Sequence, residues 1–349
     1  MHREESTKYL GDIFHTNGKS MSTILERSAQ AHAILADIRA ILQDVPLGKY
    51  KIQVGLQLRE SMFVNGVLFN SEVWQGLNTA DITMLDTVDH KVMNVICAGH
   101  AKTASEFYYL ETGTIPLKYL IASRRILYLK NILSRSDEEL IKRVYTAQRD
   151  NPTQGDFVEL VRKDLEDIDE LFDEEAICSQ DNSLIKKCLK KKIKQVAFRD
   201  LKEIQSSHSK VKNITYDNFI IQPYITSSIF TNEMTEILFN MRSCMTKTFK
   251  SNFSSFYKEN MKCSLKCSDP NALDSQSHLL QCSLVKNQLT EEEKKQTANI
   301  YYQDIFGTLE VQRRVKIYMA RMLEIWEDLL EKISLPVGSF TGPVSTVTL

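Results

Sequence analysis

The stretch from Cys263 to Cys282 constrains the fold most, because it gathers four metal-binding side chains in a short span. Cys263 and Cys267 are separated by Ser-Leu-Lys, and His278 precedes Cys282 by one helical turn. Three thiols and one imidazole form the ligand set of a closed tetrahedral zinc site. Asp269-Pro270-Asn271 suits a chain reversal between the two pairs. The spacing therefore predicts that these four side chains bind Zn²⁺.

An alternative for this stretch is a pair of buried thiols and a core histidine beside Leu279 and Leu280. The segment itself has few apolar residues with which to build such a core. A small loop-rich unit usually needs a metal to hold it together. The sequence therefore favours zinc over a metal-free core.

Cysteine usage and the N-terminus indicate the cellular compartment. The chain has seven cysteines, an odd number without regular spacing outside the cluster, which favours a reducing environment over a disulfide framework. The N-terminus is polar and charged, unlike a signal peptide. The sequence contains no run of about 20 apolar residues, so no membrane span is predicted. We expect an intracellular protein, nuclear or cytoplasmic, without a membrane partner.

The net charge of −1 hides a strong asymmetry along the chain. Residues 156–175 contain ten acidic and two basic residues, whereas residues 183–212 contain ten basic and two acidic residues. Residues 242–267 add six basic residues against one acidic residue. The acidic stretch is expected to be exposed, and the basic stretches favour a polyanionic partner. A solvated helix face is an equally open interpretation of the lysines in 183–205.

Apolar residues recur at helical spacing through most of the chain. The stripe from Ile24 to Leu42 predicts an amphipathic helix over 22–43. Lys8–Phe14 predicts a short strand, and Thr16–Gly18 the tight turn of a hairpin. Further helices are predicted at 79–97, 116–133, 183–205, 232–250, 291–305 and 309–333, with an irregular segment at 206–230. The predicted fold is mainly α, with a short N-terminal β-hairpin and a helical thumb-like bundle in 1–135, a helical connector in 136–230, a helical zinc-knuckle domain in 231–334 and a disordered tail in 335–349.

Several short motifs occur in an order that is informative as a set. They are Lys8-Tyr9-Leu10-Gly11; Asn70-Ser71-Glu72-Val73-Trp74; Tyr109-Leu110-Glu111-Thr112-Gly113 with Pro116 and Arg124-Arg125; and Met241-Arg242, Met245 and Asn252-Phe253 ahead of the Cys/His cluster. Together they resemble the C-terminal part, thumb plus zinc knuckle, of a non-LTR (LINE-type) retrotransposon reverse transcriptase. The resemblance covers roughly residues 8–330. Phe69-Asn70 stands where the family usually has Tyr-Gly.

The catalytic motif of that family is missing from the sequence. Its polymerase chemistry uses paired aspartates in an Ala-Asp-Asp hairpin, which hold two divalent ions. This hairpin should precede Tyr9-Leu10-Gly11, yet the 349 residues contain no Ala-Asp-Asp. The resemblance therefore implies a non-catalytic fragment without palm or endonuclease. It implies RNA or DNA as the partner and, in one interpretation, a separate polymerase subunit.

A thumb grips mainly backbone phosphates, and zinc knuckles combine basic flanks with stacking aromatics such as Phe253, Phe256 and Tyr257. The predicted nucleic-acid-binding residues are Tyr9, Leu10, Gly11, Arg124, Arg125, Lys190, Lys191, Arg242, Lys258, Lys262 and Lys266, with Lys49, Lys51 and Arg59 as further thumb candidates.

Several alternatives to these assignments stay open. Arg124 and Arg125 suit ion pairs with Glu106 or Glu111 equally well. The zinc suits a purely structural role, in an all-helical scaffold whose partners are proteins. His90 has no Cys or Ser partner at a readable spacing, so no nucleophile–base pair is predicted.

Overall fold

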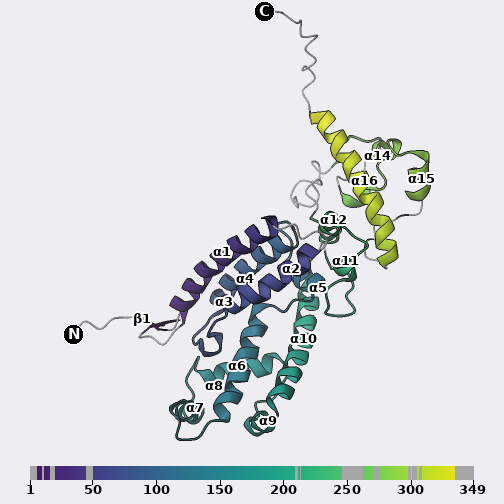
Figure 1. Cartoon of the computed structure of the whole chain (residues 1–349). Helices are drawn as coiled ribbons and strands as arrows, with labels where there is room; N and C mark the ends of the chain where they lie inside the picture. The colour runs from purple at the N-terminus through teal and green to yellow at the C-terminus, as the bar shows by residue number, and fades with distance from the viewer. Residues whose placement is uncertain are drawn as a thin grey trace, which may run out of the picture. The chain divides into compact units, whose positions relative to one another are not determined.

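The computed structural model of this chain is mainly helical, as predicted (Figure 1). It divides into two compact units, Met1–Asn232 and Glu233–Leu349, which we call the N-terminal unit and the C-terminal unit. The predicted regions 1–135 and 136–230 both lie in the N-terminal unit. The structure describes residues 6–9, 12–15, 20–44, 50–208, 211–212, 214–245, 262–269, 275–297, 300, 305 and 309–334. No helix within these ranges is both long and apolar enough to cross a membrane.

The N-terminal strands differ from the predicted arrangement. In place of one strand over Lys8–Phe14, the structure has β1 (Ser6–Tyr9) and β2 (Asp12–His15), which pair antiparallel with Tyr9 opposite Asp12. The predicted turn at Thr16–Gly18 lies outside the described residues.

The next helices pack around an apolar core between α1 (Met21–Asp44) and α4 (Thr79–Ile96). Between them lie α2 (Lys51–Leu58), the π-helical η2 (Arg59–Val64), α3 (Asn65–Val67) and the 3₁₀ helix η3 (Ser71–Val73). The predicted apolar stripe of α1 is buried, with Ile24 and Ile38 fully covered. Gly55 allows α2 to approach α4 closely, because a Cβ there would lie 2.7 Å from Ile96 Cγ2.

The second half of this unit runs from α5 (Ser105–Thr112) and α6 (Leu117–Leu133) through four further helices. These are α7 (Leu140–Asp150), α8 (Phe157–Asp167), α9 (Glu174–Ser179) and α10 (Asn182–Ser207). Much of the acidic stretch is helical, and two of its aspartates cap helices. Asp156, which is buried, accepts from Glu159 N (2.8 Å), and Asp173 accepts from Ala176 N (2.9 Å).

A late segment of the N-terminal unit is fastened to α5 by a buried carboxylate. Glu111 is fully buried and accepts hydrogen bonds from the Tyr216 and Tyr224 hydroxyls, each at 2.6 Å. Tyr224 lies in the short helix α11 (Pro223–Thr226), within a region predicted to be irregular. Gly113 ends α5 at φ +63°, where a Cβ would lie 2.6 Å from the Ile220 carbonyl carbon. We call the contact of Glu111 with these two tyrosines the tyrosine clasp.

The C-terminal unit is built from short helices against one long helix. α12 (Asn232–Arg242) is followed by α13 (Gln276–Leu279), α14 (Ser283–Asn287), α15 (Glu291–Thr297) and α16 (Leu309–Ser334). Thr290 and Glu293 form the reciprocal hydrogen bonds of a capping box at the start of α15, at 2.8 and 3.2 Å. α12 ends at Arg242, so it is shorter than the predicted helix over 232–250. The predicted tail in 335–349 lies outside the described residues.

Candidate metal centre and the predicted nucleic-acid contacts

The four predicted ligands converge in the C-terminal unit. Their donor atoms all lie within 4.8 Å of one another, and Cys267 Sγ is 3.4 Å from His278 Nε2. Cys263, His278 and Cys282 are buried, whereas Cys267 is partly exposed. The cluster can therefore hold a metal ion, at the place that the spacing predicted.

Local backbone geometry aims each ligand at the same point. Cys263 and Cys267 flank a turn that is closed by a hydrogen bond from Lys266 N to Cys263 O (2.9 Å), with Lys266 at φ +54°. His278 lies in α13 and Cys282 immediately precedes α14. Cys282 N donates to His278 O at 2.8 Å, which holds the second pair one turn apart.

The donor set and its spacing fit zinc. With Zn–S bonds of about 2.3 Å and Zn–N bonds of about 2.0 Å, neighbouring donors of a tetrahedral site lie roughly 3.5–3.8 Å apart. The Cys267–His278 distance is close to that range, so small shifts would complete the tetrahedron. Four protein donors leave no coordination position for a reacting water, which is typical of a structural site.

Burial changes the chemistry of the thiols. It raises the pKa of Cys263 to about 12, and it also raises the pKa of Cys282. Without a metal both side chains are therefore protonated at neutral pH. A divalent cation stabilises the thiolates and displaces their protons, so metal affinity should fall as the pH falls.

The cluster also packs on an apolar surface, which corrects one sequence argument. Leu279 and Val285 are fully buried, and α13 and α14 contact α16. The rings of His278 and the buried Trp326 form a T-shaped pair, with centroids 6.2 Å apart. The segment 263–282 has few apolar residues of its own, but α16 supplies them. A metal at this centre would therefore join the ligand loop to an existing small core.

Two arginines predicted to contact nucleic acid are engaged inside the N-terminal unit. The half-buried Arg124 donates to the Leu68 carbonyl and to Asn65 Oδ1 (3.2 Å). Arg125 is buried and pairs with Asp164 at 2.5 Å. An ion pair with a carboxylate was the alternative interpretation, but the predicted partners Glu106 and Glu111 are not the ones used.

Four other predicted basic contacts are buried, half-buried or outside the described residues. Arg59 is fully buried in a two-hydrogen-bond pair with Asp89, at 2.6 and 2.7 Å, so it cannot grip a phosphate in this structure. Although burial would lower it, the pKa of Arg59 is raised by Asp89. Lys51 is half-buried, and Lys49 lies outside the described residues. Arg242 is buried too and donates to the Ile305 carbonyl at 3.1 Å.

The remaining predicted contacts are exposed lysines or lie at the edge of the described chain. Lys190 and Lys191 are exposed on α10, and Lys262 and Lys266 are exposed on the ligand loop. Tyr9 lies in β1. Leu10, Gly11, Lys258 and the aromatic residues Phe253, Phe256 and Tyr257 lie outside the described residues. Among the predicted contacts whose side chains the structure describes, these four lysines are exposed and within reach of a phosphate.

One polar pair in the structure was not predicted from the sequence. His90 Nδ1 lies 2.8 Å from Ser105 Oγ, beside a cavity of about 470 Å³ that Asp86 also lines. Burial lowers the pKa of His90, so its ring is neutral at neutral pH. Asp86 and His90 are four residues apart on α4, a spacing that already places them on one face. The contact with Ser105 depends on how α4 and α5 pack, which no local pattern shows.

Comparisons with known proteins found no match to this chain. No family model matches the chain, and neither a curated protein nor a solved structure matches it.

Proposed function

We propose that this chain is a zinc-bearing, non-catalytic nucleic-acid-binding protein, related to the thumb and knuckle region of non-LTR retrotransposon reverse transcriptases. The observation that carries the proposal is the convergence of three cysteines and one histidine beside exposed lysines on the same loop. The family relation is supported by the order of the sequence motifs. The non-catalytic character is supported by the missing Ala-Asp-Asp motif.

The zinc would act structurally. Its four ligands come from the Cys263–Cys267 turn and from the α13–α14 region. Binding would therefore fix the ligand loop against the short helices that pack on α16. A metal that orders a small unit contributes its binding free energy directly to folding.

Nucleic-acid contact in this unit would come from the ligand loop. Lys262 and Lys266 flank Cys263, and both side chains are exposed. Lysine ammonium groups contact phosphates as point charges and carry no base preference by themselves. We therefore expect salt-sensitive binding with little dependence on nucleotide sequence.

Metal analysis combined with an RNA and DNA titration at two salt concentrations tests the proposal. We expect stoichiometric zinc and an affinity that falls steeply as salt rises. Lys262→Glu with Lys266→Glu should weaken binding while zinc is retained. The matched control is Lys286→Glu with Lys295→Glu, which changes the charge of the same unit equally at other exposed positions.

Three outcomes would contradict parts of the proposal. A purified protein that contains no metal and still keeps its fold would contradict the proposed zinc centre. Bound zinc without RNA or DNA binding would favour an all-helical protein-interaction scaffold. Extension of an annealed primer in magnesium or manganese would refute the non-catalytic assignment.

A further inference from the structure

The acidic stretch 156–175 and the basic stretch 183–212 carry equal and opposite net charges in the sequence, but their side chains are only partly paired in the structure. Many carboxylates of the acidic stretch are used at specific places away from the lysines of α10. Asp156 and Asp173 cap α8 and α9, Asp164 pairs with Arg125, and Glu174 accepts from the Tyr145 hydroxyl at 2.6 Å. These acids therefore do not neutralise the basic helix that follows them.

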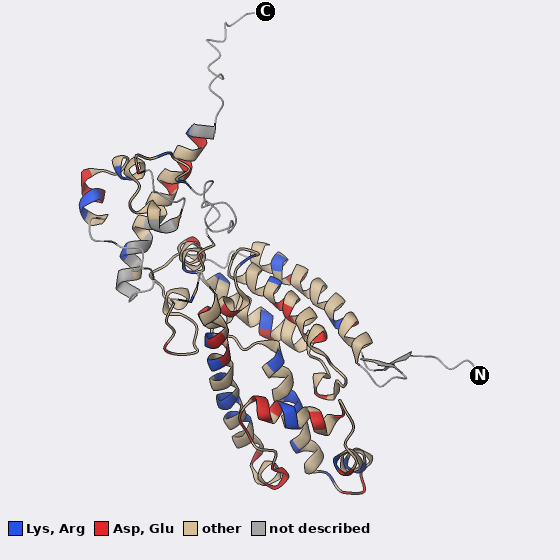
Figure 2. Ribbon diagram, turned by 180° about the vertical axis from the view of Figure 1, so that it is seen from behind, with Lys and Arg blue, Asp and Glu red and all other residues tan. Residues whose placement is uncertain are grey.

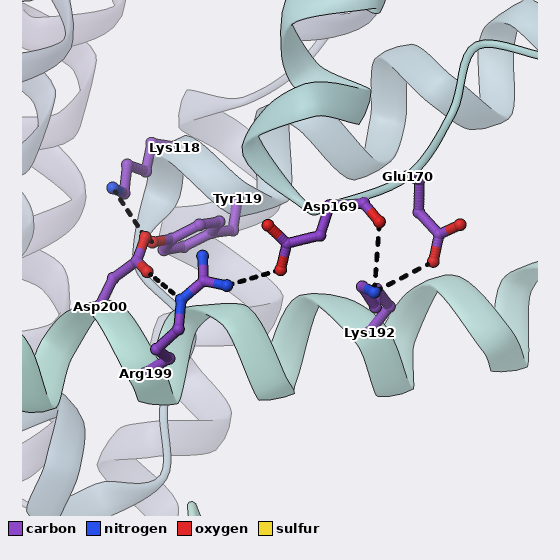
Figure 3. A network of polar contacts seen from close by, with 7 residues as sticks. All are labelled: Lys118, Tyr119, Asp169, Glu170, Lys192, Arg199 and Asp200. Carbon is purple, nitrogen blue, oxygen red and sulfur yellow. Dashed lines mark hydrogen bonds and ion pairs between the residues drawn. The ribbon is translucent and has the colours of Figure 1, made fainter.

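One flank of α10 is neutralised by a polar network, which Figure 3 shows. Lys192 pairs with Glu170 at 3.4 Å, and Arg199 pairs with Asp169 at 2.5 Å and with Asp200 at 3.1 Å. The same network reaches α6, because the Tyr119 hydroxyl donates to Asp200 at 2.5 Å. This flank fastens α10 to the rest of the unit, and its basic side chains Lys192 and Arg199 are paired with carboxylates.

The other flank carries a row of lysines that the network does not reach. At spacings of i, i+1, i+4, i+5 and i+8, they occupy one side of the helix. Within the described part of the chain, none of these side chains has a carboxylate partner within 4.0 Å. Figure 2 shows basic segments repeating along α10. We call this row the lysine stripe: Lys186, Lys187, Lys190, Lys191 and Lys194, of which the first four are exposed and the fifth is half-buried.

The stripe is held in a fixed shape. Ile185, Leu189, Ile193 and Val196 are buried beneath it, so α10 cannot turn without losing its core contacts. The eight-residue rise from the first to the last lysine is about 12 Å, at about 1.5 Å per residue. That length is comparable with the width of the DNA major groove, about 12 Å, which separates phosphates of opposite strands.

We infer that the lysine stripe binds the phosphate backbone of double-stranded nucleic acid. The inference rests on the proposed nucleic-acid binding and adds a second contact surface, on the N-terminal unit, with its own partner geometry. Residues 186–194 contain no aromatic side chain, whereas binding of single strands commonly uses base stacking on aromatics. A row of lysines instead suits backbone phosphates without base readout.

The same features disfavour an anionic membrane surface as the partner. A helix that lies on a membrane presents an apolar face to the lipid. The apolar face of α10 is instead buried in the unit, and its exposed large apolar residues, Leu184 and Ile204, lie near opposite ends of the helix.

The test compares two variants of the full-length, zinc-loaded protein on a blunt duplex over a series of salt concentrations. The stripe variant replaces four exposed stripe lysines by glutamine. The control variant makes the same net-charge change at scattered exposed positions. The changes are Lys186→Gln, Lys187→Gln, Lys190→Gln and Lys191→Gln in the first, and Lys102→Gln, Arg143→Gln, Lys163→Gln and Lys212→Gln in the second.

We expect the stripe variant to bind the duplex more weakly, with a log–log salt slope shallower by about 3–4, because each lost phosphate contact removes about 0.9. The control variant should keep the wild-type slope. Circular dichroism and thermal unfolding should show that both variants fold. An unchanged slope in the stripe variant, an equal loss in the control, or stripe-dependent binding to anionic vesicles in place of duplex would overturn the inference.

The ligand-loop variant Lys262→Glu with Lys266→Glu separates this inference from the proposed function. Loss of duplex binding in the stripe variant alone supports the stripe and refutes the ligand-loop contact. Loss in the ligand-loop variant alone refutes the stripe and leaves the proposed function standing. A wild-type protein that binds no nucleic acid refutes both.

Discussion

The buried pair of Arg59 and Asp89 gives the sharpest prediction about stability. Arg59 donates two hydrogen bonds to Asp89 and a third to the Ile115 carbonyl at 3.3 Å, while the Tyr109 hydroxyl donates to Asp89 at 2.9 Å. Arg59→Met removes the cation and leaves a buried carboxylate, which should cost about 3–5 kcal/mol. Asp89→Leu leaves a buried guanidinium and should cost about as much.

The double variant Arg59→Met/Asp89→Leu removes both charges together. It leaves only the Tyr109 hydroxyl and the Ile115 carbonyl without one of their partners, at about 1 kcal/mol each. We therefore expect the double variant to be more stable than either single variant, with a coupling energy of at least about 3 kcal/mol.

Urea denaturation followed by tryptophan fluorescence measures this cycle in the N-terminal unit alone. The chain has two tryptophans, and the structure buries Trp74 in the N-terminal unit and Trp326 in the C-terminal unit. A Trp326→Phe background leaves Trp74 as the reporter in all four proteins. Single variants that cost less than about 1 kcal/mol, or costs that simply add, would refute the reasoning.

Three further predictions concern other parts of the chain. Cys263→Ser should abolish stoichiometric zinc binding, measured by elemental analysis, and increase proteolysis of the C-terminal unit; unchanged zinc would refute the site. Burial raises the pKa of Asp86 to about 6, so the folded state binds its proton more tightly and stability falls as pH rises from about 4 to about 6. Asp86→Asn should raise the free energy of unfolding by roughly 1–3 kcal/mol at pH 7 and by much less near pH 4; equal effects at both pH values would contradict this. Gly113→Ala should cost more in thermal unfolding than Gly155→Ala, because both have positive φ but only the first brings a Cβ within 2.6 Å of Ile220 backbone; equal costs would exclude the clash.

Short-range patterns were enough to predict the mainly helical fold and the ligand cluster, but not every helix boundary. The stripe from Ile24 to Leu42 predicted α1 because burial of one helix face repeats every three to four residues. The Cys263–Cys282 spacing predicted convergence because a turn and a helix place each ligand pair locally. In both cases the residues that decide the structure are close in the sequence.

Partners that are far apart in the sequence could not be predicted. Arg125 was predicted to contact nucleic acid, with an ion pair to Glu106 or Glu111 as the alternative, but it pairs with Asp164 on α8. Arg59 looked like a surface cation because its partner Asp89 lies 30 residues away. The charge of a residue indicates which kind of partner it can bind, whereas the packing of the helices decides which partner it reaches.

The tyrosine clasp has a consequence for how the chain acquires its fold during synthesis. Glu111 and Tyr224 are 113 residues apart, and a ribosome that adds about 5–20 residues per second needs roughly 6–23 s to synthesise that stretch. Until then the Glu111 carboxylate of the nascent α5 lacks at least one of the two hydroxyls that donate hydrogen bonds to it. A shortened protein that ends near residue 135 would lack both tyrosines of the clasp. Fragments meant to isolate the first helices should therefore extend through α11.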